Sequence, residues 1–287
     1  MPILVDKSSR VLIQGVTGAV GRQYAERMRA GGTPLVAGVT PGKGGSDVSG
    51  TPVYNTVREA IDAEGVNVSL IVVPPNQVCD AVFEAIEQGL KTVAVYTDEV
   101  PIHDTLKLVS YAEKCGVSLL GPGSAGVATP GECNIGEMSE SMLMPGKVGV
   151  LTKSGSLSGE VLRFMKRRGI GQSTVCAVGG GYVTGLRLKD VLAMYLADPA
   201  TSQVIMLGEV GGADEVEAAE LIAAASKSVY AYIAGHYAPP GVRMGHAGAI
   251  LGDRSDGAEY KSKILREAGA VTASTIAELF DYLGQLE

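Results

Sequence analysis

The sequence predicts an α/β protein made of two doubly wound units. Its 287 residues are about twice the length of an average domain, so two units are expected. Hydrophobic residues make up 46% and charged residues 19%, with 39 glycines and no tryptophan, which is typical of a soluble, glycine-rich α/β chain. In both halves short apolar runs alternate with helix-like runs, which predicts parallel strands joined by right-handed crossovers.

The first half opens with a strand expected over 10–14, a glycine-rich turn over 15–21 and a helix over 22–30. A strand, a turn of this kind and a helix begin a Rossmann-like unit. Apolar runs predict further strands at 34–38, 68–73, 91–96 and 117–120. Helices are expected between them at 56–63, 77–88 and 103–115.

A stretch rich in glycine, proline and polar residues, 121–146, separates the two halves and shows little periodicity. We place the domain boundary inside it, which gives units 1–125 and 126–287. The second unit is expected to have strands at 147–152, 174–178, 204–207 and 229–234, and a last helix at 274–286.

Charge and hydropathy exclude several classes of protein. The net charge of −7 argues against a nucleic-acid binder, and the one dense basic patch, Arg163 with 166–168, suits the end of a helix. No apolar run reaches the ~18 residues of a membrane span, so we expect a cytoplasmic protein, or one of an organelle matrix, with no membrane partner. The four cysteines form no CxxC pair, so no metal site is predicted.

The strongest candidate for chemistry is His246, which lies in the glycine-rich segment 241–250. Imidazole becomes a good nucleophile when a carboxylate holds its opposite ring N–H. Glu209 is the candidate partner, because it follows the apolar run 204–207 and would lie at the carboxyl end of a buried strand. The alternative is a loop histidine without chemistry.

Two loops of the first half favour a phosphorylated ligand. Gly15, Gly18 and Gly21 have the spacing of a phosphate-binding turn at a helix N-terminus. An NAD site would need an acidic residue after the second strand, whereas this chain has a Gly/Pro loop carrying Lys43. The pattern therefore favours a phosphorylated nucleotide other than NAD, with a solvated turn lysine as the alternative.

A third candidate is Lys153-Ser-Gly-Ser-Leu-Ser158, which follows a predicted strand and precedes a predicted helix. Its hydroxyls and free amides form an anion cradle along the helix dipole, although serines there are often simple helix caps. The spacing of Gly155-Ser-Leu-Ser-Gly159 does not fit a nucleophile elbow.

Taken together, these segments resemble one known family over nearly the whole chain: the α subunit of succinyl-CoA synthetase, with malate–CoA ligase and the matching part of ATP-citrate lyase. The resemblance is carried by Gly15-Val-Thr-Gly18, 38–45, 52–59, 129–133, 208–212 and 243–249. It implies a Rossmann-like CoA-binding domain followed by a flavodoxin-like doubly wound domain with a phosphohistidine loop.

The resemblance also implies roles for matching residues. His246 would be the phosphorylated histidine, and Glu209 would orient it and stabilise its charge. CoA would be bound by Thr17, Gly18, Ala19, Val20, Lys43, Val73, Pro74, Tyr96, Thr97 and Asp98, the last standing where the family typically has glutamate. The acid and phosphate site would be formed by Ser154, Ser156, Gly159 and Tyr182.

The implied reaction has three steps and requires a second chain. A phosphoryl group passes from ATP or GTP to the histidine and then to a small carboxylic acid, and CoA displaces phosphate from the acyl phosphate. This chain has no Walker-type lysine loop, so an ATP-grasp β subunit would bind the nucleotide with Mg²⁺, in an αβ or α₂β₂ assembly.

The acid pocket departs from the succinate pattern. Gly159 stands where such relatives have tyrosine, Gly179-Gly-Gly-Tyr182 replaces Gly-Gly-Asp-Pro, and 121–126 also differs. In citrate-using relatives an arginine binds the extra carboxylate of citrate. This chain has Tyr182 at that position, so citrate is not supported as the acid. We expect malate, or a hydroxylated or sulfonated acid, as alternatives to succinate. A CoA-binding regulatory protein without turnover and an NAD-dependent oxidoreductase are the other two readings.

Overall fold

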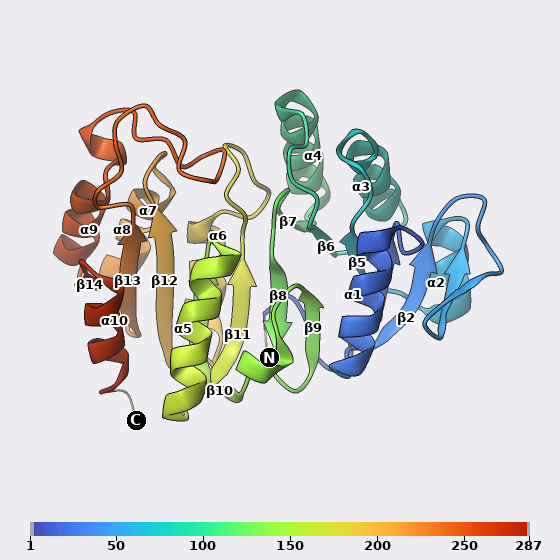
Figure 1. Cartoon of the computed structure of the whole chain (residues 1–287), viewed down its shortest axis with the longest axis horizontal. Helices are drawn as coiled ribbons and strands as arrows, with labels where there is room; N and C mark the ends of the chain where they lie inside the picture. The colour runs from blue at the N-terminus through green and yellow to red at the C-terminus, as the bar shows by residue number, and fades with distance from the viewer. Residues whose placement is uncertain (1–2, 286–287) are drawn as a thin grey trace.

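The computed structural model describes residues 3–285. Within that range the strands form two seven-stranded sheets that lie next to each other, with the first unit to the right in Figure 1 and the second to the left. Both sheets are mainly parallel and have helices packed on them. The predicted α/β class with a Rossmann-like first unit is confirmed.

The first sheet has the strand order β3-β4-β2-β1-β5-β6-β7. Its strands are β1 Val11–Gln14, β2 Leu35–Val39, β3 Asp47–Val48, β4 Thr51–Tyr54, β5 Val68–Ile71, β6 Thr92–Val95 and β7 Ser118–Leu120. Its helices are α1 Ala19–Ala30, α2 Val57–Glu64, α3 Val78–Glu87 and α4 Ile102–Cys115, with the short 3₁₀ helix η1 at Pro75–Gln77. Helices α2, α3 and α4 share one apolar core on one face of the sheet, and α1 packs on the other face.

The second sheet has the order β14-β13-β12-β10-β11-β8-β9. Its strands are β8 Gly126–Thr129, β9 Cys133–Gly136, β10 Pro145–Thr152, β11 Gln172–Ala177, β12 Gln203–Glu209, β13 Ser228–Ala234 and β14 Val271–Ala273. Its helices are α5 Gly155–Arg168, α6 Leu188–Ala197, α7 Asp214–Glu217, α8 Ala219–Ala223, α9 Ala258–Glu267 and α10 Ile276–Leu283, with η2 at Glu140–Met142 and η3 at Arg254–Asp256. The predicted last helix extended to Leu286, which lies outside the described residues.

The structure adds elements that the sequence did not predict. Strands β3, β4 and β14 are short, and β8 and β9 form an antiparallel hairpin inside the stretch expected to be irregular. In that hairpin Gly126 and Gly136 have φ of 97° and 125°, and a Cβ on either would meet the backbone of the other strand. Such glycine positions carry no apolar alternation, which is why the pattern did not indicate strands.

Helix α1 begins at Ala19, three residues earlier than predicted. The glycine turn is therefore shorter than expected, and Gly21 lies inside the helix. A Cβ on Gly21 would collide with the backbone of Gly15 and Val16, so this position requires glycine for close packing of the helix on the turn.

One apolar core crosses the junction of the two sheets. Tyr24 and Met28 of α1 belong to the same buried cluster as Ile135 of β9 and Leu151 of β10. The β8–β9 hairpin, green in Figure 1, thus lies between α1 and the rest of the second sheet. The change from one sheet to the other falls between Leu120 and Gly126, while the partition of the chain at residue 125 stays a prediction.

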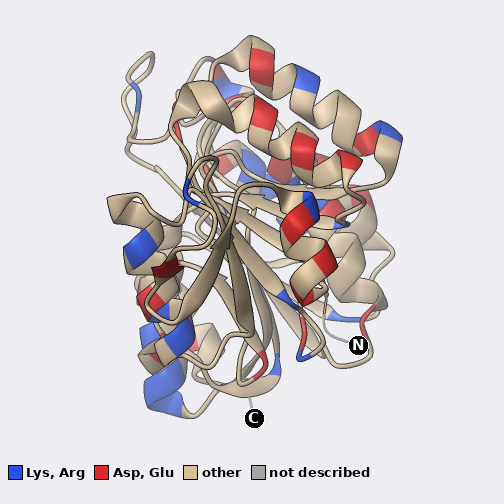
Figure 2. Ribbon diagram, turned by 90° about the vertical axis from the view of Figure 1, so that its right-hand side faces the viewer, with Lys and Arg blue, Asp and Glu red and all other residues tan. Residues whose placement is uncertain are grey.

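Charged residues lie mainly on the outer helices and loops. Figure 2 shows acidic and basic segments interspersed there, with few charges along the central strands. None of the helices in residues 3–285 combines the length and apolar character needed to cross a bilayer.

Candidate active site

The candidate site lies at the carboxyl ends of the second sheet's strands. Strands β10 and β12 are neighbours, so the residues that end them emerge side by side. Lys153 directly follows β10, and Glu209 is the last residue of β12. Since ligand sites in open α/β sheets lie at this edge, the position expected for Glu209 is the one the structure gives it.

His246 and Glu209 form a hydrogen-bonded pair. The imidazole Nδ1 lies 2.7 Å from Glu209 Oε2, and the Glu209 side chain is only 10% exposed. An ionised carboxylate can only accept, so the proton of a neutral His246 must lie on Nδ1. The lone pair is then on Nε2, and no described residue hydrogen-bonds to that atom.

Glu209 also changes the acid–base behaviour of the imidazole. Its hydrogen bond and its charge raise the pKa of His246 above the ordinary value of 6.5, against the opposite effects of burial and of the Lys153 ammonium. A carboxylate that accepts from the imidazolium favours the charged form. The same contact therefore stabilises positive charge on the ring.

A tight turn presents His246. The amide of Met244 donates to the carbonyl of Ala249, and the amide of Ala249 donates to the carbonyl of His246. The amide of Gly248 donates to the carbonyl of Gly180, which fixes the turn against the loop after β11. A Cβ on Gly180 would collide with the His246 ring, so glycine at 180 allows the close approach.

A buried lysine faces the same carboxylate. Lys153 is 5% exposed, and its Nζ lies 3.8 Å from Glu209 Oε1 and 3.6 Å from Asp214 Oδ2. Glu209 Oε1 itself is buried and accepts no hydrogen bond from the described residues. Burial would lower the pKa of Lys153, but the carboxylates of Glu215, Glu209 and Asp214 outweigh it and raise that pKa. The lysine is therefore a charged group at neutral pH.

A second buried ion pair holds the backbone around Glu209. Lys261 and Glu215 have fully buried side chains whose charged atoms are 2.6 Å apart. Lys261 Nζ also donates to the carbonyls of Glu209 and Gly211, and Glu215 Oε1 accepts from the amide of Glu209. The pair thus fixes the end of β12 from which Glu209 projects.

His246 opens onto a cavity of about 240 Å³ between the two units. The first unit supplies Tyr96 and Asp98, and the second supplies Lys153 and Ser156. Ser154 does not line this cavity; it is the N-cap of α5 and accepts from the amide of Leu157 at 3.4 Å. The start of α5 faces the cavity through Gly155 and Ser156, as expected for an anion cradle at a helix N-terminus.

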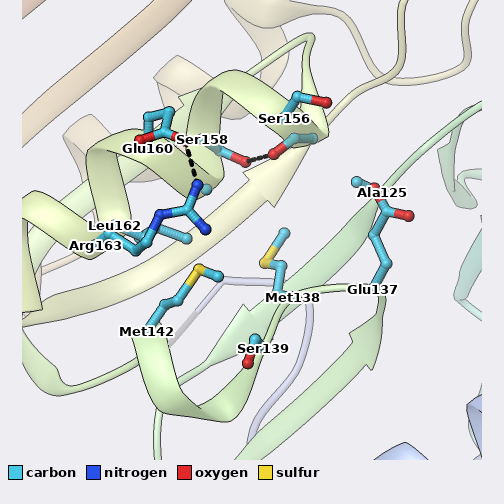
Figure 3. Close-up of a pocket in the computed structure, with 12 residues that line it drawn as sticks. Ala125, Glu137, Met138, Ser139, Met142, Ser156, Ser158, Glu160, Leu162 and Arg163 are labelled. Atoms are coloured by element: carbon cyan, nitrogen blue, oxygen red, sulfur yellow. Dashed lines mark hydrogen bonds and ion pairs between the residues drawn. The ribbon is translucent and has the colours of Figure 1, made fainter.

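A second cavity, of about 330 Å³, adjoins the first and is shown in Figure 3. Both cavities are lined by Ala125, Glu137, Gly155 and Ser156. Gly159 lines only the second, where a Cβ would have Met142 Sδ, 4.0 Å away, as its nearest neighbour. Below, the cavity of about 240 Å³ next to His246 is called the histidine cavity, and the cavity of about 330 Å³ lined by Gly159 is called the side cavity.

Four of the residues expected to bind CoA line a third cavity, of about 420 Å³, in the first unit. They are Thr17, Gly18, Val73 and Pro74. Ala19 and Val20, in the first turn of α1, do not line it. Lys43 is exposed on the loop after β2, which is tied to the glycine turn by a 3.2 Å contact between the hydroxyls of Thr17 and Thr40.

This third cavity is called the CoA cavity below, after the ligand expected there. Segment 96–98 lies between it and the histidine cavity. The Thr97 hydroxyl donates to the carbonyl of Val73 at 2.6 Å, and Val73 lines the CoA cavity. Tyr96 and Asp98 on either side of Thr97 line the histidine cavity. The three residues therefore lie next to both cavities, and their role in binding CoA stays a prediction.

Tyr182 differs from the sequence expectation. It is 62% exposed and is absent from the lining of the described cavities. The loop after β11 approaches His246 through Gly180 instead, and the Tyr182 side chain is largely exposed. A role for it in binding the acid stays a prediction that needs a partner chain.

Sequence reasoning missed several residues of the site. The serine-rich segment 153–158 predicts no separate role for Lys153, although a lysine directly after a buried strand is itself a signal. Glu137 follows β9, which was not predicted, so nothing indicated its place. The pair Glu215 and Lys261 is 46 residues apart in sequence, and only the fold joins it. Among residues 3–285, no cluster of His, Cys, Asp and Glu has a metal-binding arrangement.

Comparisons with known families agree with this arrangement. The CoA binding domain family matches residues 6–99, which contain the glycine turn and most of the CoA cavity. The CoA-ligase family matches residues 151–271, which contain Lys153, Glu209 and His246.

Curated relatives match over the whole chain. Succinate–CoA ligase [ADP-forming] subunit alpha 2 of Archaeoglobus fulgidus is 42% identical over 286 residues, covering 100% of both chains. The succinate–CoA ligase subunit alpha of Aquifex aeolicus is also 42% identical, covering 100% of this chain and 95% of its own.

A solved structure shows the same fold. ATP citrate lyase from Methanothrix soehngenii, in complex with citrate and coenzyme A, superposes with a TM-score of 0.90 at 24% identity, covering 99% of this chain. This chain spans 50% of that longer one. The sequence identity to the curated relatives decides the relationship: the chain belongs to the α-subunit family of the succinate–CoA ligases, and its chemistry is that of an acid–CoA ligase.

Proposed function

We propose that this chain is the half of an acid–CoA ligase that binds CoA and carries the phosphoryl group on His246 Nε2. The observation that carries the proposal is the 2.7 Å contact between His246 Nδ1 and buried Glu209, at the mouth of a cavity that both units line. This contact leaves Nε2 as the free nucleophile and directs it away from Glu209.

Three displacements make up the reaction. Nε2 attacks the terminal phosphorus of a nucleoside triphosphate, so an N–P bond forms and the nucleoside diphosphate leaves. A carboxylate oxygen of the acid then attacks that phosphorus, the N–P bond breaks and the lone pair returns to Nε2. Finally the CoA sulfur attacks the acyl carbon, and inorganic phosphate leaves.

The chain's own residues support each displacement. Glu209 holds the ring and offsets the positive charge that develops on it. Lys153 supplies a buried ammonium close to the Glu209 carboxylate, and the start of α5 supplies amides and the Ser156 hydroxyl. A phosphoryl group on Nε2 would thus meet positive charge and donors rather than an apolar wall.

CoA binding is proposed along the path already described. The nucleotide end would occupy the CoA cavity near Thr17 and Pro74, with Lys43 close to its phosphates. The pantetheine arm would pass Val73 and Thr97, and the thiol would reach the histidine cavity beside Asp98. The glycine turn fits this group, because Gly15 and Gly18 leave space at the N-terminus of α1.

A β subunit completes the proposed enzyme. The relatives are named as α subunits, and this chain has no Walker-type loop. We propose an ATP-grasp partner that binds ATP or GTP with Mg²⁺, in an αβ or α₂β₂ assembly. A cytoplasmic location is part of the proposal, because CoA and nucleoside triphosphates are intracellular substrates.

The acid is proposed to be a small carboxylic acid. Succinate is supported by the names of the relatives, whereas the open space at Gly159 favours a different acid. A second candidate function, a regulatory CoA-binding protein without turnover, is motivated by the same reshaped pocket, but the intact pair of His246 and Glu209 speaks against it.

The test is a coupled assay of the purified pair of subunits. The panel contains CoA, ATP or GTP, and succinate, malate, citrate and hydroxylated or sulfonated acids, with His246→Asn as the blank. We expect phosphorylation of His246 and acyl-CoA formation with one acid class, both lost in the blank. Absence of any phosphorylation of His246 by the cognate partner would favour the regulatory protein.

A further inference from the structure

We infer that the side cavity is a subsite for an apolar substituent of the acid, so that the substrate is a monocarboxylic acid with an apolar side group rather than a dicarboxylate. This inference rests on the proposed function, because it assumes that the acid is phosphorylated in the histidine cavity. It narrows the substrate class of the same site.

The side cavity lies where a substituent of a reacting acid would extend. It shares Ala125, Gly155 and Ser156 with the histidine cavity, so the two spaces meet at the start of α5. An acid with its carboxylate next to His246 would therefore have its other end directed into the side cavity.

The side cavity is roomy because of the residues on one face of α5. Gly155, Gly159 and Leu162 line it at helical spacing, and Gly159 contributes no side chain. A Cβ added to Gly159 would have Met142 Sδ as its nearest neighbour, 4.0 Å away, which is an ordinary van der Waals contact. A volume of about 330 Å³ exceeds what the bare carbon chain of a four-carbon acid needs.

The inner wall of the cavity is apolar. Leu162 and Met138 are 1% and 5% exposed, and Met142 lies on the opposite side from α5, as Figure 3 shows. Methionine side chains are flexible and adapt to ligands of different shape. Burying an apolar substituent against this wall would stabilise the bound acid.

The charges of the side cavity do not suit a second carboxylate. Its one lysine or arginine is Arg163, which is paired with Glu160 at the surface. Glu137 stands at the junction of the two cavities, and its exposed carboxylate accepts no hydrogen bond from the described residues. Beyond the donors at the start of α5, a terminal carboxylate in the side cavity would meet this negative charge and no unpaired cation among its lining residues, whereas a methyl or phenyl group carries no charge to be repelled.

Matched acids test the inference with the assembled pair of subunits. Succinate is compared with butanoate, and glutarate is compared with pentanoate. The two acids of each pair differ only in that one has a terminal carboxylate where the other has a methyl group. Phenylacetate tests whether the side cavity holds a larger apolar group. We expect kcat/KM at least about tenfold higher for the apolar member of each pair. Loss of phosphate from labelled His246 on addition of each acid gives a second readout.

Two variants locate the effect. Gly159→Phe fills the side cavity from α5, and Met142→Phe fills it from the opposite wall. Both should lower the ratio of kcat/KM for phenylacetate to kcat/KM for propanoate at least about tenfold. Arg167→Phe is the matched control, because it adds the same ring to an exposed position of the same helix.

The outcomes separate this inference from the proposed function. Unchanged phosphorylation of His246 in both filled variants shows that the fold and the nucleotide half-reaction persist. If succinate is preferred to butanoate, or if no acid of the panel discharges the phosphohistidine, the apolar subsite is wrong. If His246 is never phosphorylated, the proposed function fails and the subsite fails with it.

Discussion

At the scale of single residues, the reactivity of His246 follows from which ring nitrogen carries the proton. Glu209 accepts from Nδ1, so Nε2 keeps its lone pair in the neutral form. Protonation of Nε2 removes that lone pair. Because Glu209 raises the pKa of His246, the inactive imidazolium persists to higher pH than in a free histidine.

This shift predicts the pH dependence of phosphorylation. The rate of phosphohistidine formation should fall with decreasing pH, with its midpoint above 6.5. In Glu209→Gln the neutral amide no longer favours the imidazolium, so the midpoint should move to lower pH while the plateau drops about tenfold to a hundredfold. The pH–rate profile of both forms checks this, and a midpoint that does not move in Glu209→Gln contradicts the assignment.

The same shift has a consequence for stability. A group whose pKa is higher in the folded chain stabilises the fold below its unfolded pKa, and this contribution is lost as pH rises through the folded value. The pair of His246 and Glu209 therefore stabilises the fold more at pH 6 than at pH 8, the opposite direction to its effect on reactivity.

A second prediction at this scale concerns Lys153. Lys153→Met removes the buried ammonium that faces Glu209 and Asp214, so Glu209 loses a nearby positive charge, whereas Asp214 keeps its ion pair with Arg187. Phosphorylation of His246 should slow by roughly a hundredfold. Lys153→Arg should retain part of the rate. The control is Lys189→Met, because Lys189 is a half-buried lysine whose one ion-pair partner among the described residues is Glu217. Equal rates for the Lys153→Met and Lys189→Met variants would refute a role in phosphoryl binding.

At the scale of elements, the end of β12 is held by side chains from two helices. Glu215 of α7 accepts from the Glu209 amide, and Lys261 of α9 donates to two carbonyls of the same bend. The bend needs Gly211 and Gly212, whose φ values are 91° and 63°. Without this support Glu209 would have no fixed orientation toward the imidazole.

The buried pair gives a stability prediction. Lys261→Met leaves the Glu215 carboxylate buried without its cation, which should lower the free energy of unfolding by about 3–5 kcal/mol. Adding Glu215→Leu to that variant should recover part of the loss. Chemical denaturation measures both, with Lys263→Met as the control, since Lys263 is exposed and lies 3.8 Å from Glu267. A loss no larger than that of the control would show that the pair does not support the bend.

At the scale of the whole molecule, one apolar core fixes the two units relative to each other. Tyr24 of α1 packs on Tyr96 with ring centroids 4.9 Å apart, and Tyr24 belongs to the same core as Ile135 of the hairpin. The same core thus lies between the unit that holds the CoA cavity and the unit that carries His246. Segment 96–98 lies next to both cavities.

This arrangement predicts what the chain does without a partner. The isolated chain should bind CoA, because the residues of the CoA cavity all come from its first unit, but it should not phosphorylate His246 from free ATP. Calorimetric titration with CoA, and labelled ATP with and without the β subunit, check the two halves. Binding of NAD that CoA does not displace would instead support the oxidoreductase reading.

The sequence by itself predicted the fold class, the family and the pairing of His246 with Glu209. An apolar run such as 204–207 is typical of a buried parallel strand. The position of Glu209 at the carboxyl end of that strand could therefore be predicted from the local sequence pattern. The glycine turn before α1 could also be predicted from a short stretch of sequence, because the spacing of its glycines is set by the geometry of the strand-to-helix turn.

Only the tertiary structure decided how the site is supported and shaped. Lys153, Glu137, Glu215 and Lys261 come from four separate segments, and their contacts depend on strand order and helix packing rather than on spacing. Tyr182 illustrates the reverse: its motif suggested the acid site, yet its side chain is exposed. The side cavity at Gly159 arises because α5, η2 and the unpredicted hairpin converge, and no single stretch of sequence contains that convergence.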